Sequence, residues 1–239
     1  MTPAPIIDTP PRRLPTKFLR CLPLAAIGLL MPEPAFAHHG MGGRPPETFA
    51  EGLLSGLAHP VIGLDHLLFL LMAGALAGSL EAAVRYRVAA LFVVSGLLGT
   101  SVHLAAIHLP GAEALIAISV IAGGALVRSS RRPGIAPLAA LFAIAGVVHG
   151  YAYAESIVGV EAAPLLAYLG GLVVIQCAVV GGVAFVLDAL DDRSSPISTV
   201  LIQAGERRPR IQRGIAEGVR LAGSLAVAAG ALFLALSFA

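Results

Sequence analysis

The hydrophobic positions of this chain form long apolar runs that are separated by short polar segments. None of the runs alternates apolar and polar residues over ~10 positions, as the strands of a membrane β-barrel do. A helix needs ~20 apolar residues to cross a bilayer core, and the third run falls short of that length. We therefore expect an all-α integral membrane protein with six transmembrane helices, at Leu53–Leu80, Val88–Ile107, Ala112–Val127, Ile135–Ala154, Ala162–Leu187 and Ile215–Phe238.

The composition agrees with this fold class. Hydrophobic residues make up 57% of the 239 residues and charged residues only 13%, whereas ~25% of the residues of a soluble domain are charged. The two cysteines are Cys21, near the N-terminus, and Cys177, within the fifth apolar run. They provide no disulfide framework, so the fold must depend on helix packing.

The N-terminal residues 1–37 have the pattern of a cleaved signal peptide. Four basic residues precede a short apolar run, and Ala35-Phe36-Ala37 forms a small-x-small cleavage site. An uncleaved anchor helix is the alternative, but Pro32 and Pro34 disfavour a helix that continues. Cleavage leaves a periplasmic, histidine-containing segment at 38–52, followed by a six-helix transmembrane domain at 53–239.

Basic residues mark alternate loops. Arginines occur in loops 81–87, 128–134 and 188–214, whereas the loops at 108–111 and 155–161 contain no Lys or Arg. Since cytoplasmic loops carry the excess of basic residues, the first set is expected to be cytoplasmic. The mature N-terminus and the C-terminus are then both periplasmic, in a bacterial inner membrane.

The cytoplasmic loop 188–214 reads as a mobile linker whose arginines can attract anionic lipid. No aromatic residues are interleaved with those arginines, so nucleic acid is not an expected partner. The sequence also lacks a GxxxxGK[ST] motif, which argues against ATP hydrolysis by this chain. The bilayer is the partner that these features predict, and they do not set an oligomeric state.

Three ionisable residues in the first predicted helix point to metal chemistry. His59, Asp65 and His66 lie in an apolar run, where each charged side chain costs ~2.5–3.5 kcal/mol near the bilayer centre. A metal ion with nitrogen and oxygen ligands would offset that cost. All seven histidines of the chain lie between residues 38 and 149, in positions that the topology assigns to the periplasmic half.

Helix geometry limits what the first helix can do alone. His59 and His66 share a face, but seven residues of a regular helix rise ~10.5 Å. Metal–nitrogen bonds are only ~2.1 Å long, so the two histidines are expected to form successive stations rather than one site. Asp65 points ~100° away from His66 and could orient a histidine, or bind the ion if the helix is distorted.

The deeper station at His66 needs ligands from other helices. The nitrogen candidates are His103 and His149, and the oxygen candidates are Glu155, Gln176 and Tyr151 or Tyr153. Imidazole together with oxygen suits divalent nickel, cobalt, zinc or copper. His38 and His39, with the mature N-terminal amine, could capture an ion outside. Solvated loop positions and hydrogen bonds across helices are the ordinary alternatives for these histidines.

Two motifs resemble those of a known family. The run from His59 to His66 reads HPVIGLDH, and the run from His149 to Glu155 reads HGYAYAE. The first is similar to HPxxGxDH, the signature of the HupE/UreJ family of membrane metal permeases. The second matches the family's HGxAHG motif at His149 but has Tyr153 in place of the second histidine. A signal peptide, a histidine-containing N-terminus and six helices also resemble that family.

The resemblance implies secondary uptake of nickel or cobalt, with the ion as cargo and no permanently bound cofactor. Two other classes stay open. A membrane metalloenzyme would need three ligands, an open position and a general base, but HExxH and GxSxG motifs are absent. A non-transporting metal sensor or assembly factor would need to signal through loop 188–214, which is too short for a folded domain.

Overall fold

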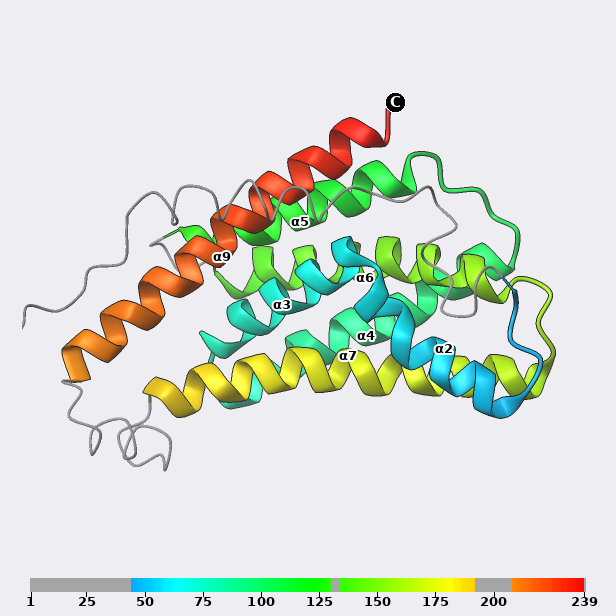
Figure 1. The fold of residues 1–239 in the computed structure, drawn as a ribbon, viewed down its shortest axis with the longest axis horizontal. Coiled ribbons are helices and arrows are strands. Elements are labelled where there is room, and N and C mark those ends of the chain that lie inside the picture. Colours follow the sequence, from blue (N-terminus) through cyan, green and yellow to red (C-terminus); the bar gives the residue numbers. More distant parts are fainter. Residues whose placement is uncertain (1–43, 130–133, 192–207, 239) are drawn as a thin grey trace, which may run out of the picture. The chain divides into compact units, whose positions relative to one another are not determined.

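The structure, a computed structural model, describes residues 44–129, 134–191 and 208–238 (Figure 1). The expected signal peptide, together with His38 and His39, lies outside the described residues. Within them, seven α-helices and one 3-10 helix occur and no strand, which confirms the all-α class. The elements are α2 (Phe49–Ile62), α3 (Leu64–Gly78), α4 (Ala82–Leu104), α5 (Ala112–Arg128), α6 (Ile135–Tyr153), η2 (Ala154–Ile157), α7 (Ala162–Asp191) and α9 (Arg208–Leu236).

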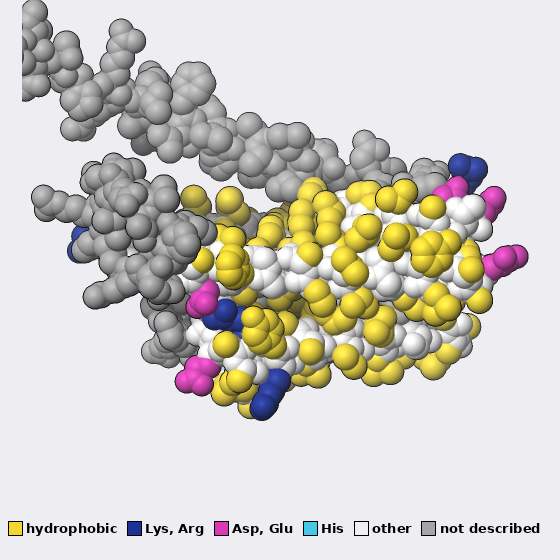
Figure 2. Space-filling model, turned by 90° about the horizontal axis from the view of Figure 1, so that it is seen from below, with side chains coloured by type: hydrophobic (Ala, Val, Ile, Leu, Met, Phe, Trp, Pro, Cys, Tyr) yellow, Lys and Arg dark blue, Asp and Glu magenta, His cyan; other side chains and the backbone are white. Residues whose placement is uncertain are grey.

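Four helical segments are long and apolar enough to cross a membrane: Ala82–Leu104, Ile135–Ile157, Ala162–Leu190 and Gln212–Leu236. The bent pair α2 and α3 makes a fifth if it counts as one span. Helix α5 has 17 residues and is the short third helix of the expected six. Figure 2 shows hydrophobic side chains over the middle of one face and charged side chains toward its two ends, as a bilayer requires. Six spans stay a prediction.

The expectation of one continuous helix at Leu53–Leu80 is wrong. Helices α2 and α3 meet at Gly63 with a bend of 78°. Gly63 has an extended backbone, with φ −71° and ψ 101°. Pro60 contributes to the break because it has no N–H to continue the α2 hydrogen-bond ladder, and glycine is itself a poor helix former. Pro60 lies in the last turn of α2, three residues before the break.

The broken ends are closed by hydrogen bonds of the main chain. The Gly63 N–H donates to the His59 carbonyl at 3.0 Å, and the Gly63 carbonyl accepts from the Leu67 N–H at 2.8 Å. At the other end of α2, Thr48 and Glu51 form a capping box. Each half is thus a complete helix, and a single residue joins them.

Two expected loops are partly helical. Helix α4 begins at Ala82, so Arg85 lies in its first turns rather than in a loop. The Arg85 guanidinium donates to the carbonyls of Gly78 and Leu80 at 3.3 and 3.1 Å and to Asp188 at 3.1 Å. These bonds satisfy the carbonyls at the end of α3, which explains why a charged residue is buried there. Helix α7 extends through Asp188, so loop 188–214 is shorter than expected.

The helices pack in close pairs, α4 with α6, α5 with α9, and α2 with α7, while α3 lies against both α7 and α5. In Figure 1, α5 and α9 run side by side. Close approach of backbones depends on small residues in a membrane. A Cβ atom on Gly99 of α4 would lie 1.9 Å from the carbonyl oxygen of Val147 in α6, so only glycine fits there.

Replacing Gly99 with alanine should destabilise the fold, because α4 and α6 must separate to admit the methyl group. We expect a loss of about 1–3 kcal/mol, the usual cost of overpacking, read as a lower unfolding midpoint of the purified protein in detergent. The matched control is Gly170→Ala, since a Cβ atom on Gly170 meets nothing within 4 Å. Equal midpoints for the two variants would contradict the proposed close contact.

Candidate metal-binding site

Two histidines from different helices meet in the interior beside the helix break. His66 lies in the first turn of α3 and is 3% exposed, and His149 lies in α6 and is fully buried. Their Nδ1 atoms are 2.8 Å apart. The rings of Phe69, Phe92 and Tyr153 surround the pair and shield it from solvent. The structure thus brings His66 and His149 together, while their role as metal ligands stays a prediction.

Ser119 of α5 lies against the far ring nitrogen of His149. Its hydroxyl oxygen is 2.7 Å from the Ile116 carbonyl oxygen and 2.8 Å from His149 Nε2, and a hydroxyl that donates to the carbonyl accepts the proton of Nε2. A neutral His149 then carries its lone pair on Nδ1, and His66 Nδ1 donates to it. The lone pair that a metal would use therefore points at His66.

The spacing of the two nitrogens is that of a hydrogen bond. His66 Nδ1 and His149 Nδ1 are 2.8 Å apart, which is an ordinary length for such a bond. An ion that bound both nitrogens at ~2.1 Å would have to displace the proton between them.

Asp65 lies in the first turn of helix α3, next to the histidine pair. Its Oδ1 accepts a hydrogen bond from the His66 N–H at 2.7 Å and lies 3.9 Å from His66 Nδ1. Negative charge at a helix N-terminus is favourable, because the first N–H groups have no partner within the helix. The break in the helix thus supplies part of the stabilisation that a carboxylate needs in an apolar region.

His59, at the end of α2, belongs to a separate buried hydrogen-bond network. The Tyr168 hydroxyl of α7 donates to the Tyr153 carbonyl at 2.7 Å, so its oxygen can accept from His59 Nδ1 at 2.8 Å. Ser156 Oγ lies 3.2 Å from the same Nδ1. A tyrosine and a serine hold the outer histidine in a fixed orientation.

The bend brings His59 and His66 closer than a straight helix would. Their ring centroids are 5.8 Å apart, and both rings lie against Tyr153, at 5.3 and 4.4 Å. The expected separation of ~10.5 Å along one axis does not apply to a helix that is broken between the two residues. The two predicted stations are therefore neighbours.

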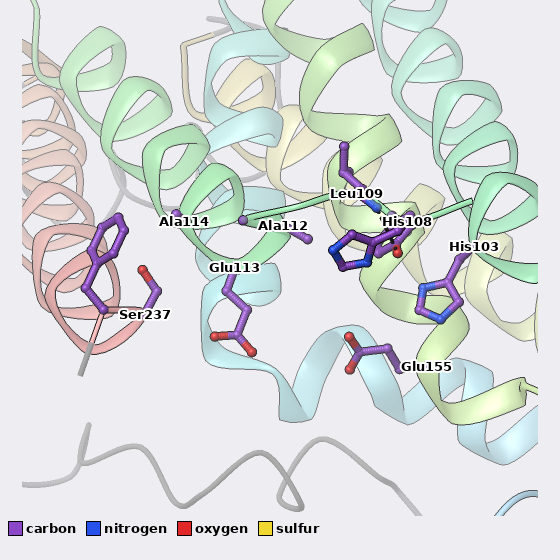
Figure 3. A pocket seen from close by; sticks show the side chains of 11 residues that line it. His103, His108, Leu109, Ala112, Glu113, Ala114, Glu155 and Ser237 are labelled. Atoms are coloured by element: carbon purple, nitrogen blue, oxygen red, sulfur yellow. Dashed lines mark hydrogen bonds between the residues drawn. The ribbon is translucent and has the colours of Figure 1, made fainter. Parts of the chain in front are cut away.

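His103 and Glu155 lie in a different cavity, which we call the helix-end pocket (Figure 3). The pocket is at the ends of α4, α5 and α6, and His103 packs on Tyr151 with ring centroids 4.3 Å apart. Gln176 is buried in α7. As the side chains stand, no three His, Cys, Asp or Glu residues in the described part of the chain are arranged to hold one ion.

Sequence reasoning missed three residues that orient the histidines: Ser119, Ser156 and Tyr168. Each is a common polar residue in an apolar helix or turn, and no motif marks it. Ser119 and Tyr168 come from helices that carry no histidine near the site, so their role depends on helix packing. Their only sequence signal is a hydroxyl group inside a long apolar run.

Comparison with known proteins identifies the family. A family model described as HupE / UreJ protein matches residues 25–233, which is most of the chain. The chain belongs to the HupE/UreJ family. The matched segment includes every described residue of the helix break and the buried histidine pair.

One relative in the HupE/UreJ family is Protein HupE of Rhizobium leguminosarum bv. viciae. It is 32% identical over 130 residues, which cover 54% of this chain and 63% of the relative. The match thus spans less than two thirds of the relative's length. No solved structure matches this chain.

Replacing Tyr168 with phenylalanine should destabilise this HupE/UreJ protein. The variant loses the shorter of two contacts to His59 Nδ1 and the shorter of two hydrogen bonds to the Tyr153 carbonyl, and each such bond contributes about 0.5–1.5 kcal/mol. The measurement is the unfolding midpoint in detergent. Tyr86→Phe is the matched control, since Tyr86 is 68% exposed. If both variants unfold at the same midpoint, the hydroxyl of Tyr168 does not hold the network together.

Proposed function

We propose that this protein takes up a divalent transition-metal ion, nickel or cobalt, across the inner membrane by secondary transport. The observation that carries the proposal is the buried contact between His66 and His149 at the break of a helix. The family and the curated relative named HupE support the same function. The ion is the substrate of the protein, and it passes through the membrane without staying bound.

The chemistry of the pair suits reversible binding. An ion that binds both Nδ1 atoms must replace the proton that His66 donates to His149, because metal ligands must be deprotonated. Ser119 keeps the His149 lone pair directed at the site, and Asp65 adds negative charge beside it. Two nitrogens and a nearby carboxylate form an incomplete set of ligands, which water can complete and which can release its ion again.

The broken helix supports transport rather than permanent storage. Irregular backbone within a membrane is tolerated only where protein or a cavity satisfies it, and transporters commonly place their substrate site at such breaks. Here the N-terminus of α3 begins at Leu64, directly beside the histidine pair. A site that only stored a metal ion would not require a transmembrane helix to be interrupted.

Loss of either histidine should abolish uptake. We expect His66→Ala and His149→Ala to lower ⁶³Ni²⁺ flux into proteoliposomes by at least about tenfold, because each removes one of two nitrogen ligands. Flux is measured with Ni²⁺ and Co²⁺ in competition, which also shows the preferred ion. The Tyr86→Phe variant, changed at an exposed position, serves as the control for reconstitution. Wild-type flux in both histidine variants would overturn the proposed site.

Asp65→Asn separates the two roles of this carboxylate. Asparagine can still accept the hydrogen bond from the His66 N–H but has no charge. If the charge serves the ion, Asp65→Asn should fold with a near-wild-type unfolding midpoint and lose flux by about tenfold or more. Full flux in a well-folded variant would restrict Asp65 to stabilising the start of α3.

A further inference from the structure

The helix-end pocket is a cavity of about 480 Å³ that the buried histidine pair does not use. Figure 3 shows its side chains around one space, with the carboxylates of Glu113 and Glu155 facing each other and the imidazoles of His103 and His108 beside them. The four residues come from α4, the 105–111 segment, α5 and η2. Each is of a type that binds divalent transition metals.

The charge of the pocket favours a cation. Glu113 and Glu155 contribute two carboxylates, and none of the eleven described residues that line the pocket is Lys or Arg. A concave site with one sign of charge raises the local concentration of the opposite ion. An anionic ligand would find no basic side chain to pair with here.

The segment that carries His108 contains an unusual backbone conformation. Ala106 has φ 56°, in the left-handed region that residues with a Cβ atom rarely adopt. The Leu109 N–H donates to the Tyr151 hydroxyl of α6 at 3.1 Å, which ties the segment to the pocket wall. Such backbone conformations persist where surrounding contacts hold them, and they cluster at binding sites.

His103 forms part of the pocket wall beside Tyr151. Its Nδ1 atom is buried and has no hydrogen-bond partner among the described residues. Because that atom is closed to solvent, a hydrated ion in the pocket can meet only the rest of the imidazole ring.

We propose that the helix-end pocket is a separate site that binds a hydrated divalent transition-metal ion before the ion reaches His66 and His149. The identity of the ion rests on the proposed function. No three side chains are placed to coordinate it directly, and six waters occupy ~180 Å³ at ~30 Å³ each, so the ion fits with its hydration shell. Carboxylates and imidazoles then bind the bound waters.

The two sites lie on different faces of α6. Tyr151, which lines the pocket, is two residues from His149 and therefore ~200° around the helix from it. An ion held in the pocket cannot also touch His149. The helix-end pocket thus raises the supply of ions at the end of the helices, and it does not complete the set of ligands at the buried pair.

The test is site-resolved chemical modification of full-length protein in vesicles. Diethylpyrocarbonate labels His108, which is exposed, and mass spectrometry gives its labelling with increasing NiCl₂. We expect Ni²⁺ to protect His108, and the double variant Glu113→Gln, Glu155→Gln to need about tenfold more Ni²⁺ for the same protection. Glu161→Gln, at another exposed helix-end carboxylate, is the matched control and should behave as wild type.

Protection should survive His66→Ala, since the two sites are separate. The double Glu variant should also need more Ni²⁺ for half-maximal uptake while its maximal rate stays unchanged. Absence of protection in the wild type, or equal protection in the double variant, would overturn the inference. Loss of protection in His66→Ala would also overturn it. Protection without any flux in the wild type would refute the transport proposal and leave this site standing.

Discussion

The structure depends on one constraint: polar groups within an apolar region must find partners inside the protein. Breaking a helix at Gly63 creates several unpaired groups at once, and this chain pairs them locally. Main-chain bonds close both ends at Gly63, Asp65 accepts the His66 N–H, and Tyr168 binds His59. The same constraint applies at the other end of α3, where Arg85 binds two carbonyls. The histidines therefore lie in a frame in which hydrogen bonds from four helices and a turn orient their rings.

Much of the fold could be predicted because apolar runs report helices directly. The starts of α5, α6 and α7 at Ala112, Ile135 and Ala162 agree with the sequence. The break at Gly63 could not be read from hydrophobicity, since both sides of it are equally apolar. Glycine and proline occur in many membrane helices without breaking them, so Pro60 and Gly63 gave no decisive signal. The start of α4 at Ala82 was missed, because polar residues such as Arg85 can extend a helix beyond its apolar run.

The candidate site was predictable in part. Ionisable residues are rare within apolar runs, so they are easily recognised as candidates. His59, Asp65, His66 and His149 were found in this way. The sequence offered two nitrogen partners for His66, His103 and His149, and helix packing decides between them. Ser119 could not be found, because a serine acquires its role only when three helices bring its hydroxyl against an imidazole. The sequence could not place His103 and Glu155 in a separate pocket. That placement depends on which helix ends meet, and helical spacing within α6 does not show it.

The close packing of α2 on α7 has a mechanical consequence. Cβ atoms on Gly52 and Gly56 would lie 2.2 and 2.1 Å from carbonyl oxygens of α7, and one on Gly74 of α3 would lie 2.6 Å from a side chain of α7. Both α2 and α3 thus pack closely on the same helix, α7, and this packing restricts bending at Gly63. His149 belongs to a different close pair, α4 with α6. A shift of α4 and α6 against α2, α3 and α7 would therefore change the distance between His66 and His149, on which the proposed uptake depends.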